Sequence, residues 1–506
     1  MPRKREFFIF CFLALLVVAL KLPSLDLPLD NDSSEHAFFA RQMMRGEILY
    51  AKYHTGHHLP GIYYTFVLAF KLFGDNPVAP KLLLLPFACG CAWLIYLMGR
   101  TFFDERSGIL GAIFYTLVSS QVLFSGTTAE MEHFANLPLI ATVFLFLILR
   151  QKNSSAVDFI WIGVLSAVSI LYKIVFIAPL ATIIVSLLIE SWLERGKTDA
   201  WKTLCFRLIS IAIGLLLLLT LVGTYFAIKG LWERLMLVFT LGVHYFGDTN
   251  LLAGGIMFPR PFGFPLFVMA VNNTPLLVFG LIGTYRLMRR SFPMQSSADM
   301  TDFTLALWVI ISFASAGLRG GGYEHYALVV LPATALIAAS EISHAYQHWQ
   351  YSLTHQQAFL GASTLTALIV INFFWANFDL YRYYFPYKWA QIFTENSAIQ
   401  YYPDPQQALV DYIKIHTTPD DFVYVWSDNI TLYYSVNRLP PIDILMPYYV
   451  SATGPPQRIF DPRTKYIILD EATAIFRPQW LINGLDENYF LETTIGGKEL
   501  YRRKTI

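Results

Sequence analysis

The sequence predicts an all-α polytopic membrane protein that ends in a small C-terminal α/β domain. Of its 506 residues, 55% are hydrophobic and only 14% are charged, so the polar residues are too few to cover a soluble globule of this size. Several runs approach the ~20 apolar residues that cross a bilayer as a helix. From about residue 377 onward the composition changes to proline-rich turns and short strand-like runs.

Apolar runs predict about eleven membrane spans. They cover residues 7–23, 81–99, 107–125, 135–149, 157–172, 174–192, 204–228, 265–286, 302–318, 326–342 and 357–376. The first run follows MPRKR and lacks a small-residue cleavage site, which favours a retained helix over a removed signal peptide. Only Tyr172 and Lys173 separate two of these spans.

Lysine and arginine in the short connections predict the orientation, because they favour the cytoplasm. Alternate connections carry them, at Arg3, Lys4 and Arg5; Arg100 and Arg106; Arg150 and Lys152; Arg195, Lys197, Lys202 and Arg207; and Arg286, Arg289 and Arg290. The N-terminus is then cytoplasmic, and an odd number of spans leaves the C-terminal domain outside.

The first outer connection, residues 24–80, is too long for a turn. Its run EHAFFARQMMRG predicts a helix that Ser33 or Ser34 caps and Gly46 ends. The run PGIYYTFVLAFKLFG is apolar but shorter than a span, which is typical of a helix at the membrane interface.

The C-terminal part, residues 377–506, is predicted to form a water-exposed domain beyond the transmembrane part, residues 1–376. QALVDYIKIHT has a helical pattern, and FVYVW, YIIL and FLETTI have strand patterns. The segment is long enough to hold a core of its own.

Two acidic clusters lie in the outer connections and are candidates for chemistry. Asp30, Asp32 and Glu35 lie in the first, and Glu130 and Glu132 in the second. One interpretation is a solvated turn in which Asp32 or Ser33 caps a helix. The other is a shared cavity, because ionisable groups at the boundary of a polytopic protein usually serve function.

A third candidate segment is RGGGYEHYALVVLPA, which places Arg319, Tyr323, His325 and Tyr326 at an outer helix entrance. Arginine grips phosphate with two parallel hydrogen bonds. Lys173 lies on the outer side against the positive-inside bias, which suggests an anionic partner. For both cations, snorkelling to lipid headgroups remains the alternative.

Composition and spacing also limit the cofactors and partners. A formal net charge of +1 excludes nucleic acid, whose binding needs a basic surface. Cys11, Cys89, Cys91 and Cys205 lie in apolar runs and are expected to pack there. The histidines of HTGHH, with His36, lack a firm ligand spacing for zinc. No cofactor is expected, although a divalent metal at the carboxylates stays an alternative.

Several motifs carry a resemblance to a known family. DSSEHAFFARQMMRGEILY followed by HHLPGIYY resembles the acidic first outer loop of GT-C superfamily glycosyltransferases, of the bacterial protein O-mannosyltransferase and aminoarabinose-transferase type. AEMEHF resembles their Asn-Thr-Glu-x-Phe loop, RGGGYEHYALVVLP their Arg-x-Tyr-x-His-Tyr helix start, and PDDFVYVWSDNITLYYSVNRLPP a strand and turn of their outer domain. Two positions depart from the pattern: Ser33 replaces an acidic residue, and His58 replaces a lysine.

The resemblance implies a membrane enzyme that transfers a monosaccharide from a polyprenyl-phosphate donor to an envelope acceptor, with inversion, at the outer face of the bacterial inner membrane. It favours Asp32 over Asp30 as the general base and Glu132 over Glu130 as an orienting carboxylate. Lys173 and Arg319 are expected to stabilise the leaving phosphate. The further binding residues we expect are Lys52, His57, His58, Tyr63, Tyr323, His325 and Tyr326.

Two rival functions remain to be weighed. A transporter or flippase of a lipid or sugar would place its charges along a pathway at mid-span and pair interrupted helices in two halves, whereas these charges lie in outer loops. A receptor or assembly protein that presents the C-terminal domain is the third reading. Full activity after Asp32→Asn and Glu132→Gln would favour either rival.

Overall fold

The computed structural model describes residues 2–504, except for 55, 153, 197–198, 249–259, 295, 318–322, 394–405, 428–429, 448–449, 451–456 and 471–476. The chain divides into two units. Unit 1 comprises residues 1–25, 81–224 and 249–385, and unit 2 comprises residues 26–80, 225–248 and 386–506.

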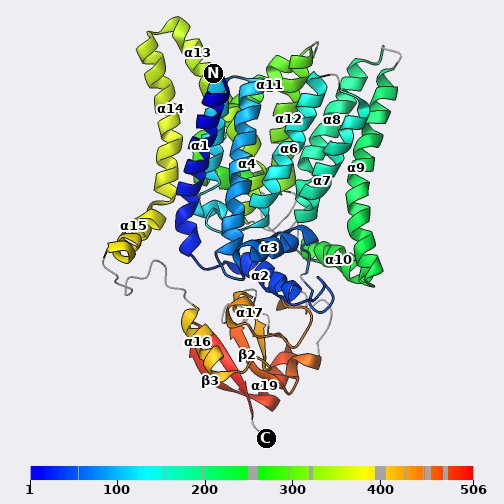
Figure 1. The fold of residues 1–506 in the computed structure, drawn as a ribbon, viewed down its shortest axis with the longest axis vertical. Helices are drawn as coiled ribbons and strands as arrows, with labels where there is room; N and C mark the ends of the chain where they lie inside the picture. The colour runs from blue at the N-terminus through cyan, green and yellow to red at the C-terminus, as the bar shows by residue number, and fades with distance from the viewer. Residues whose placement is uncertain are drawn as a thin grey trace. The chain divides into compact units, whose positions relative to one another are not determined.

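Unit 1 is a bundle of long helices that run side by side (Figure 1). Its helices are α1 Pro2–Lys21, α4 Ala79–Phe102, α5 Glu105–Val118, α6 Met131–Gln151, α7 Ile160–Tyr172, α8 Ala178–Leu193, α9 Ala200–Ile228, α11 Arg260–Ser291, α12 Ser297–Gly317, α13 Leu331–Ser352, α14 His355–Ala376 and α15 Phe378–Phe393, of which α4, α9 and α15 extend past the boundary of the unit. Short 3₁₀ turns join some of them: η1 Leu22–Asp26, η2 Val122–Phe124, η3 Ala156–Phe159, η4 Ile174–Ile177 and η5 Glu324–Val329.

Eight helical segments among the described residues are long and apolar enough to cross a membrane. They are Lys4–Asp26, Ala79–Phe102, Met131–Gln151, Ile174–Leu193, Ala200–Ile228, Pro265–Ser291, Ala298–Gly317 and His355–Ala376. The other three predicted spans are helical too. However, α5 has 14 residues and α7 has 13, and α13 carries polar side chains such as Glu341 and His344 from its middle onward.

The helix α11 is interrupted within its predicted span. Asn273 has non-helical angles, φ −157° and ψ 76°, and Pro275 lacks the amide that would continue the hydrogen-bond ladder. The Asn273 side chain accepts a hydrogen bond from Leu276 N at 3.0 Å. The second half of α11 therefore begins with its own side-chain cap.

Unit 2 combines a pair of helices with a four-stranded sheet. The helices α2 Asn31–Met44 and α3 Pro60–Phe73 pack against each other. The remaining elements are α10 Trp232–Asp248, α16 Gln407–His416, β1 Phe422–Trp426, α17 Thr431–Val436, η6 Gln457–Phe460, β2 Thr464–Asp470, α19 Gln479–Asn488, β3 Tyr489–Ile495 and β4 Lys498–Arg503. The helix and the three strands that the sequence predicts after residue 377 are all present.

The sheet has the strand order β1-β2-β4-β3, in which β1 and β2 are parallel and the other pairs antiparallel. Trp426 and Leu469 face a core to which Leu481 and Leu485 of α19 contribute. On the opposite face, the Tyr466 ring contacts Tyr412 of α16. Helices therefore cover both faces of the sheet (Figure 1).

The start of α2 differs from the prediction. The helix begins at Asn31, and the side chain of Asp30 caps it by accepting a hydrogen bond from Ser33 N at 3.2 Å. Ser33 and Ser34 lie inside the helix, so the prediction that one of them is the cap is wrong. Gly46 follows the end of the helix, as predicted, with a φ of 98° that favours glycine.

Candidate functional site

In unit 1, Glu132 lies in the first turn of α6, next to a lysine and a histidine. Lys173 Nζ forms an ion pair with Glu132 Oε1, and His325 Nε2 lies 3.8 Å from the same oxygen. Lys173 Nζ also lies 4.0 Å from the centre of the Tyr326 ring, a cation–π contact. We call Glu132, Lys173, His325 and Tyr326 the Glu132 cluster.

The ion pair of the Glu132 cluster is buried. Glu132 is 1% exposed and Lys173 is 8% exposed. Water therefore solvates neither charge well, and each depends on the other for its stabilisation. At the rim, the half-exposed Tyr323 stacks on the His325 ring, with centroids 5.6 Å apart.

A break between helices places Lys173. The helix α7 ends at Tyr172, and Lys173 is extended, with φ −163° and ψ 139°, before η4 begins. The break falls at the two residues that separate two predicted spans. Because Lys173 lies outside a regular helix, helical geometry does not set the direction of its side chain.

Buried donors hold the segments that carry the Glu132 cluster. Lys21 Nζ donates to Ser119 O at 3.1 Å and to Gly126 O at 2.7 Å, which fixes the turn between α5 and α6. Asn136 Nδ2 donates to Leu328 O at 3.1 Å and joins α6 to η5, the turn that carries His325 and Tyr326. The position of Glu132 therefore depends on polar contacts beyond its own.

In unit 2, a second buried glutamate lies between α2 and α3. Tyr63 Oη donates to Glu35 Oε1 at 3.0 Å, and His58 Nδ1 lies 3.4 Å from that oxygen. The His36 ring packs edge-on against His58 and Tyr63, with centroids 5.4 and 5.3 Å away. We call Glu35, His36, His58 and Tyr63 the Glu35 cluster, and all four side chains are buried.

The two aspartates at the start of α2 have different positions. Asp30 has a structural role as the helix cap. Asp32 lies in the first turn and is half-buried, where the helix dipole favours a negative charge. Asp30 is thus engaged as a cap, and the choice of Asp32 as the candidate base stays a prediction.

The remaining predicted site residues have varied surroundings. Tyr63 is fully buried inside the Glu35 cluster, His57 is half-buried beside the His58 ring, and Lys52 is exposed, with its Nζ 5.3 Å from the centre of the Tyr53 ring. Arg319 lies outside the described residues. Within the part of the chain that is described, no group of three or more His, Cys, Asp or Glu side chains is arranged to hold a metal ion.

Sequence reasoning missed the central place of Glu35 and His36. A signal was present, because Asp32, Glu35 and His36 have the i, i+3, i+4 spacing that places residues on one helix face. Sequence reasoning also missed a histidine contact to α10. Gly56 N donates to His54 Nδ1 at 3.1 Å, so His54 Nε2 carries the proton that it donates to Arg234 O at 2.8 Å.

Further contacts join the loop that carries His54 to the rest of unit 2. His54 N donates to Asp443 O at 2.7 Å, and Arg234 forms an ion pair with Asp443 at 2.8 Å. Burial lowers the pKa of His54 to about 4. We call His54, Arg234 and Asp443 the His54 latch.

The helical bundle, the long first connection and the terminal α/β part define a multi-pass membrane protein of the GT-C fold. Residues 57–222 match the family model described as dolichyl-phosphate-mannose-protein mannosyltransferase. No curated protein matches the sequence.

Solved structures agree with this class over nearly the whole chain. ArnT from Cupriavidus metallidurans in the apo state matches with a TM-score of 0.63 at 13% identity, over 99% of this chain and 98% of ArnT. Its complex with undecaprenyl phosphate gives 0.62 at 13% identity, over 98% and 97% of the two chains. AglB from Archaeoglobus fulgidus, an oligosaccharyltransferase in complex with an inhibitory peptide and a dolichol-phosphate, gives 0.56 at 14% identity, over 100% and 75%. These similarities confirm the predicted fold class.

Proposed function

We propose that the chain is a membrane glycosyltransferase that moves a monosaccharide from a polyprenyl-phosphate donor to a lipid, glycan or protein acceptor. The observation that carries the proposal is the end-to-end fold match to ArnT, a protein whose structure holds undecaprenyl phosphate. The family-model match over residues 57–222 supports the same reaction class.

Asp32 is the proposed general base. The acceptor hydroxyl gives its proton to the Asp32 carboxylate as its oxygen bonds to the anomeric carbon. The bond from that carbon to the phosphate oxygen breaks, and the polyprenyl phosphate leaves with the electron pair, so the anomeric configuration inverts. A positioned base is typically worth about 10² to 10⁴-fold in rate.

Lys173 is the proposed contact for the leaving phosphate, together with Arg319. An ammonium group has three N–H donors, so Lys173 can serve Glu132 and a phosphate oxygen at once. Glu132 holds the ammonium in place through their ion pair, and burial strengthens its attraction for developing negative charge. His325, Tyr323 and Tyr326 supply a polar and aromatic rim for the sugar or its carrier.

The Glu35 cluster and the loop before it have a supporting role in this proposal. Tyr63 and His58 hold the Glu35 carboxylate, which fixes α3 against the first turns of α2 and hence the setting of Asp32. Lys52 and His57, the more accessible side chains of this loop, are the proposed assistants in substrate contact.

The proposed setting is the bacterial inner membrane, with the N-terminus in the cytoplasm and the C-terminal domain outside. The basic residues of alternate connections support this orientation. Cysteine accessibility from the outer face tests it: a single cysteine placed at exposed Ile415 of α16 is expected to react in intact spheroplasts, and one placed at exposed Arg289 is not.

The decisive experiment compares outer-envelope lipids and glycoproteins by mass spectrometry in cells with and without the gene. Loss of one monosaccharide modification is expected, and the wild-type gene restores it. Asp32→Asn is expected not to restore it, whereas the matched control Asp30→Asn is, because asparagine caps a helix as well as aspartate does. An unchanged profile without the gene, or full restoration by Asp32→Asn, would contradict the proposal.

A further inference from the structure

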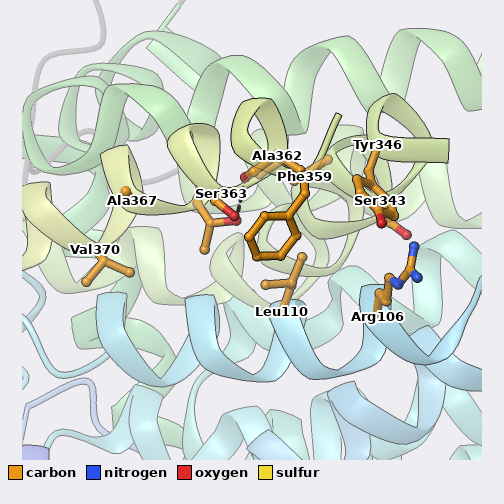
Figure 2. Close-up of a pocket in the computed structure, with 11 residues that line it drawn as sticks. Arg106, Leu110, Ser343, Tyr346, Phe359, Ala362, Ser363, Ala367 and Val370 are labelled. Atoms are coloured by element: carbon orange, nitrogen blue, oxygen red, sulfur yellow. Dashed lines mark hydrogen bonds between the residues drawn. The ribbon is translucent and has the colours of Figure 1, made fainter. Parts of the chain in front are cut away.

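A groove in unit 1, separate from the Glu132 cluster, lies between α5, α13 and α14. It encloses about 580 Å³, within the range of roughly 300 to 1,000 Å³ that ligand pockets occupy. Arg106, Ser343 and Tyr346 line one end, whereas Ala367 and Val370 line the other (Figure 2). The remaining lining residues are Leu110, Ile342, Phe359, Ala362, Ser363 and Thr366. The groove therefore has a polar, cationic end and a largely apolar length.

Arg106 gives the polar end its charge. Its side chain is exposed, and its guanidinium carbon lies 4.4 Å from the centre of the Tyr346 ring, which orients it. Among the described residues, no carboxylate forms an ion pair with Arg106. The guanidinium therefore offers its N–H fork, which matches a phosphate in geometry.

The neighbouring carboxylates already have cationic or polar partners. Asp104 accepts hydrogen bonds from Ser343 Oγ at 2.7 Å and Gln347 Nε2 at 2.8 Å, and it also caps α5. Glu105 forms an ion pair with Arg5 at 2.7 Å. Glu105 is therefore neutralised by Arg5, and Asp104 is held by neutral donors of α13, so that Arg106 is the cationic side chain that lines the mouth of the groove.

The same ion pair places the groove in the bundle. Arg5 belongs to the start of α1 and Glu105 to the start of α5, so the mouth lies at the end of unit 1 where α1 begins. The apolar length runs along α14, which is long and apolar enough to span a membrane. At bilayer depth, the surroundings that can fill an open apolar groove are lipid chains.

We propose that this groove binds an anionic phospholipid, with its phosphate on Arg106 and one acyl chain along the apolar length toward Val370. Basic pockets between transmembrane helices commonly hold anionic headgroups. A cation at the mouth and an apolar length behind it match the two halves of such a lipid. The site would stabilise the contact of α14 with α5 and α13.

The test uses the purified full-length protein and native mass spectrometry, with phosphatidylglycerol and phosphatidylcholine of identical acyl chains as probes. The wild type is expected to retain phosphatidylglycerol more tightly. Arg106→Gln is expected to weaken that binding about fivefold, the loss that corresponds to one cation near a charged surface. Ala367→Phe, which fills the apolar end and keeps Arg106, is expected to weaken binding of both lipids.

Matched controls separate this site from general effects. Arg289→Gln removes an exposed cation of α11 that does not line the groove, and Leu368→Phe adds bulk at a position that is 45% exposed. Equal binding of both lipids by the wild type, equal losses in Arg289→Gln and Arg106→Gln, or unchanged binding in Ala367→Phe would overturn the proposal. A dimer mass that Ala367→Phe dissociates would also overturn it, because a second copy would then fill the groove. If Arg106→Gln does not fold, lipid binding by Ala367→Phe and by its control Leu368→Phe still tests the proposal.

Discussion

The Glu132 cluster and the Glu35 cluster stabilise a buried glutamate in different ways. Each buries a glutamate beside a histidine and a tyrosine, but among the residues that the structure describes only Glu132 has a lysine as its partner. A buried ion pair needs both charges, because either one alone is left without compensation. The Glu35 carboxyl instead accepts a hydrogen bond from Tyr63 beside the His58 ring, a contact that a neutral acceptor in place of the acid can also make. The contacts in the Glu132 cluster therefore keep a charged pair buried, whereas the contacts in the Glu35 cluster hold two helices in position.

The largest effect is expected from removing one charge of the Glu132 cluster. Glu132→Gln removes the carboxylate that pairs with the buried Lys173 ammonium, which costs about 3 to 5 kcal/mol of unfolding free energy. Chemical denaturation of the purified protein measures this loss. The double variant Glu132→Gln, Lys173→Met is expected to regain most of the stability but none of the transfer activity. If the single variant is as stable as the wild type, the buried Lys173 does not depend on Glu132 for its stabilisation.

Acid is expected to affect unit 2 through the His54 latch. The folded-state pKa of His54, about 4, is below the value of about 6.5 of a free histidine. The unfolded chain therefore binds a proton that the folded chain does not. Stability is retained above pH 6.5, falls as the pH drops from 6.5 to 4, and loses about 3 kcal/mol in all.

Hydrogen exchange of residues 47–58 at pH 7 and pH 5 measures this opening. Faster exchange is expected at pH 5. His54→Gln keeps a donor for Arg234 O but does not titrate, so its exchange should show no such acceleration. The same acceleration in His54→Gln would assign the acid effect to another group.

A smaller effect is expected inside the Glu35 cluster. Tyr63→Phe removes the hydroxyl that donates to the buried Glu35 carboxylate, which costs about 1 to 3 kcal/mol. Replacing both partners, as Tyr63→Phe with Glu35→Met, is expected to restore part of the lost stability, because the buried carboxyl is removed together with its donor. Denaturation midpoints of the two variants give the comparison, and a double variant less stable than the single one would contradict the network interpretation.

The smallest effect is expected at the cap of α2. Asp30→Ala removes the acceptor for Ser33 N and costs about 1 kcal/mol. Asp30→Ser, which retains an acceptor, should cost less than half of that. Thermal unfolding measures both, and equal losses would show that the side chain of Asp30 does not act as a cap.

Much of the fold was predictable because hydrophobic runs and strand patterns are local signals. The helical spans and the strands FVYVW, YIIL and FLETTI all appear at the expected positions. The cap of α2 was not, because Asp30, Ser33 and Ser34 are all good capping residues and their order in the chain does not choose among them. The break in α11 was also missed, although the polar residues at 272–274 and Pro275 interrupt the apolar run at that point.

The candidate sites were predictable in part for a related reason. Glu132, His325 and Tyr326 were recognised from motifs, and Lys173 from its position against the positive-inside bias. The structure brings all four side chains together. Their ion pair and ring contacts depend on α6, η4 and η5, which are far apart in sequence, so no spacing rule supplied them. The His54 latch could not be predicted, because nothing in the sequence relates His54 to Arg234 or Asp443.

The interrupted helix α11 changes the meaning of a familiar sequence pattern. Asn272, Asn273 and Thr274 spell an N-x-T glycosylation sequon, which normally marks a surface loop. Here Asn272 is 2% exposed and its side-chain amide donates to Val268 O at 2.8 Å, while Asn273 caps the second half of the helix. Both asparagines lie within an apolar segment long enough to span the bilayer, where no glycan can be attached. The asparagines of the sequon therefore hydrogen-bond to backbone groups at the helix break, and the sequon is not a modification site.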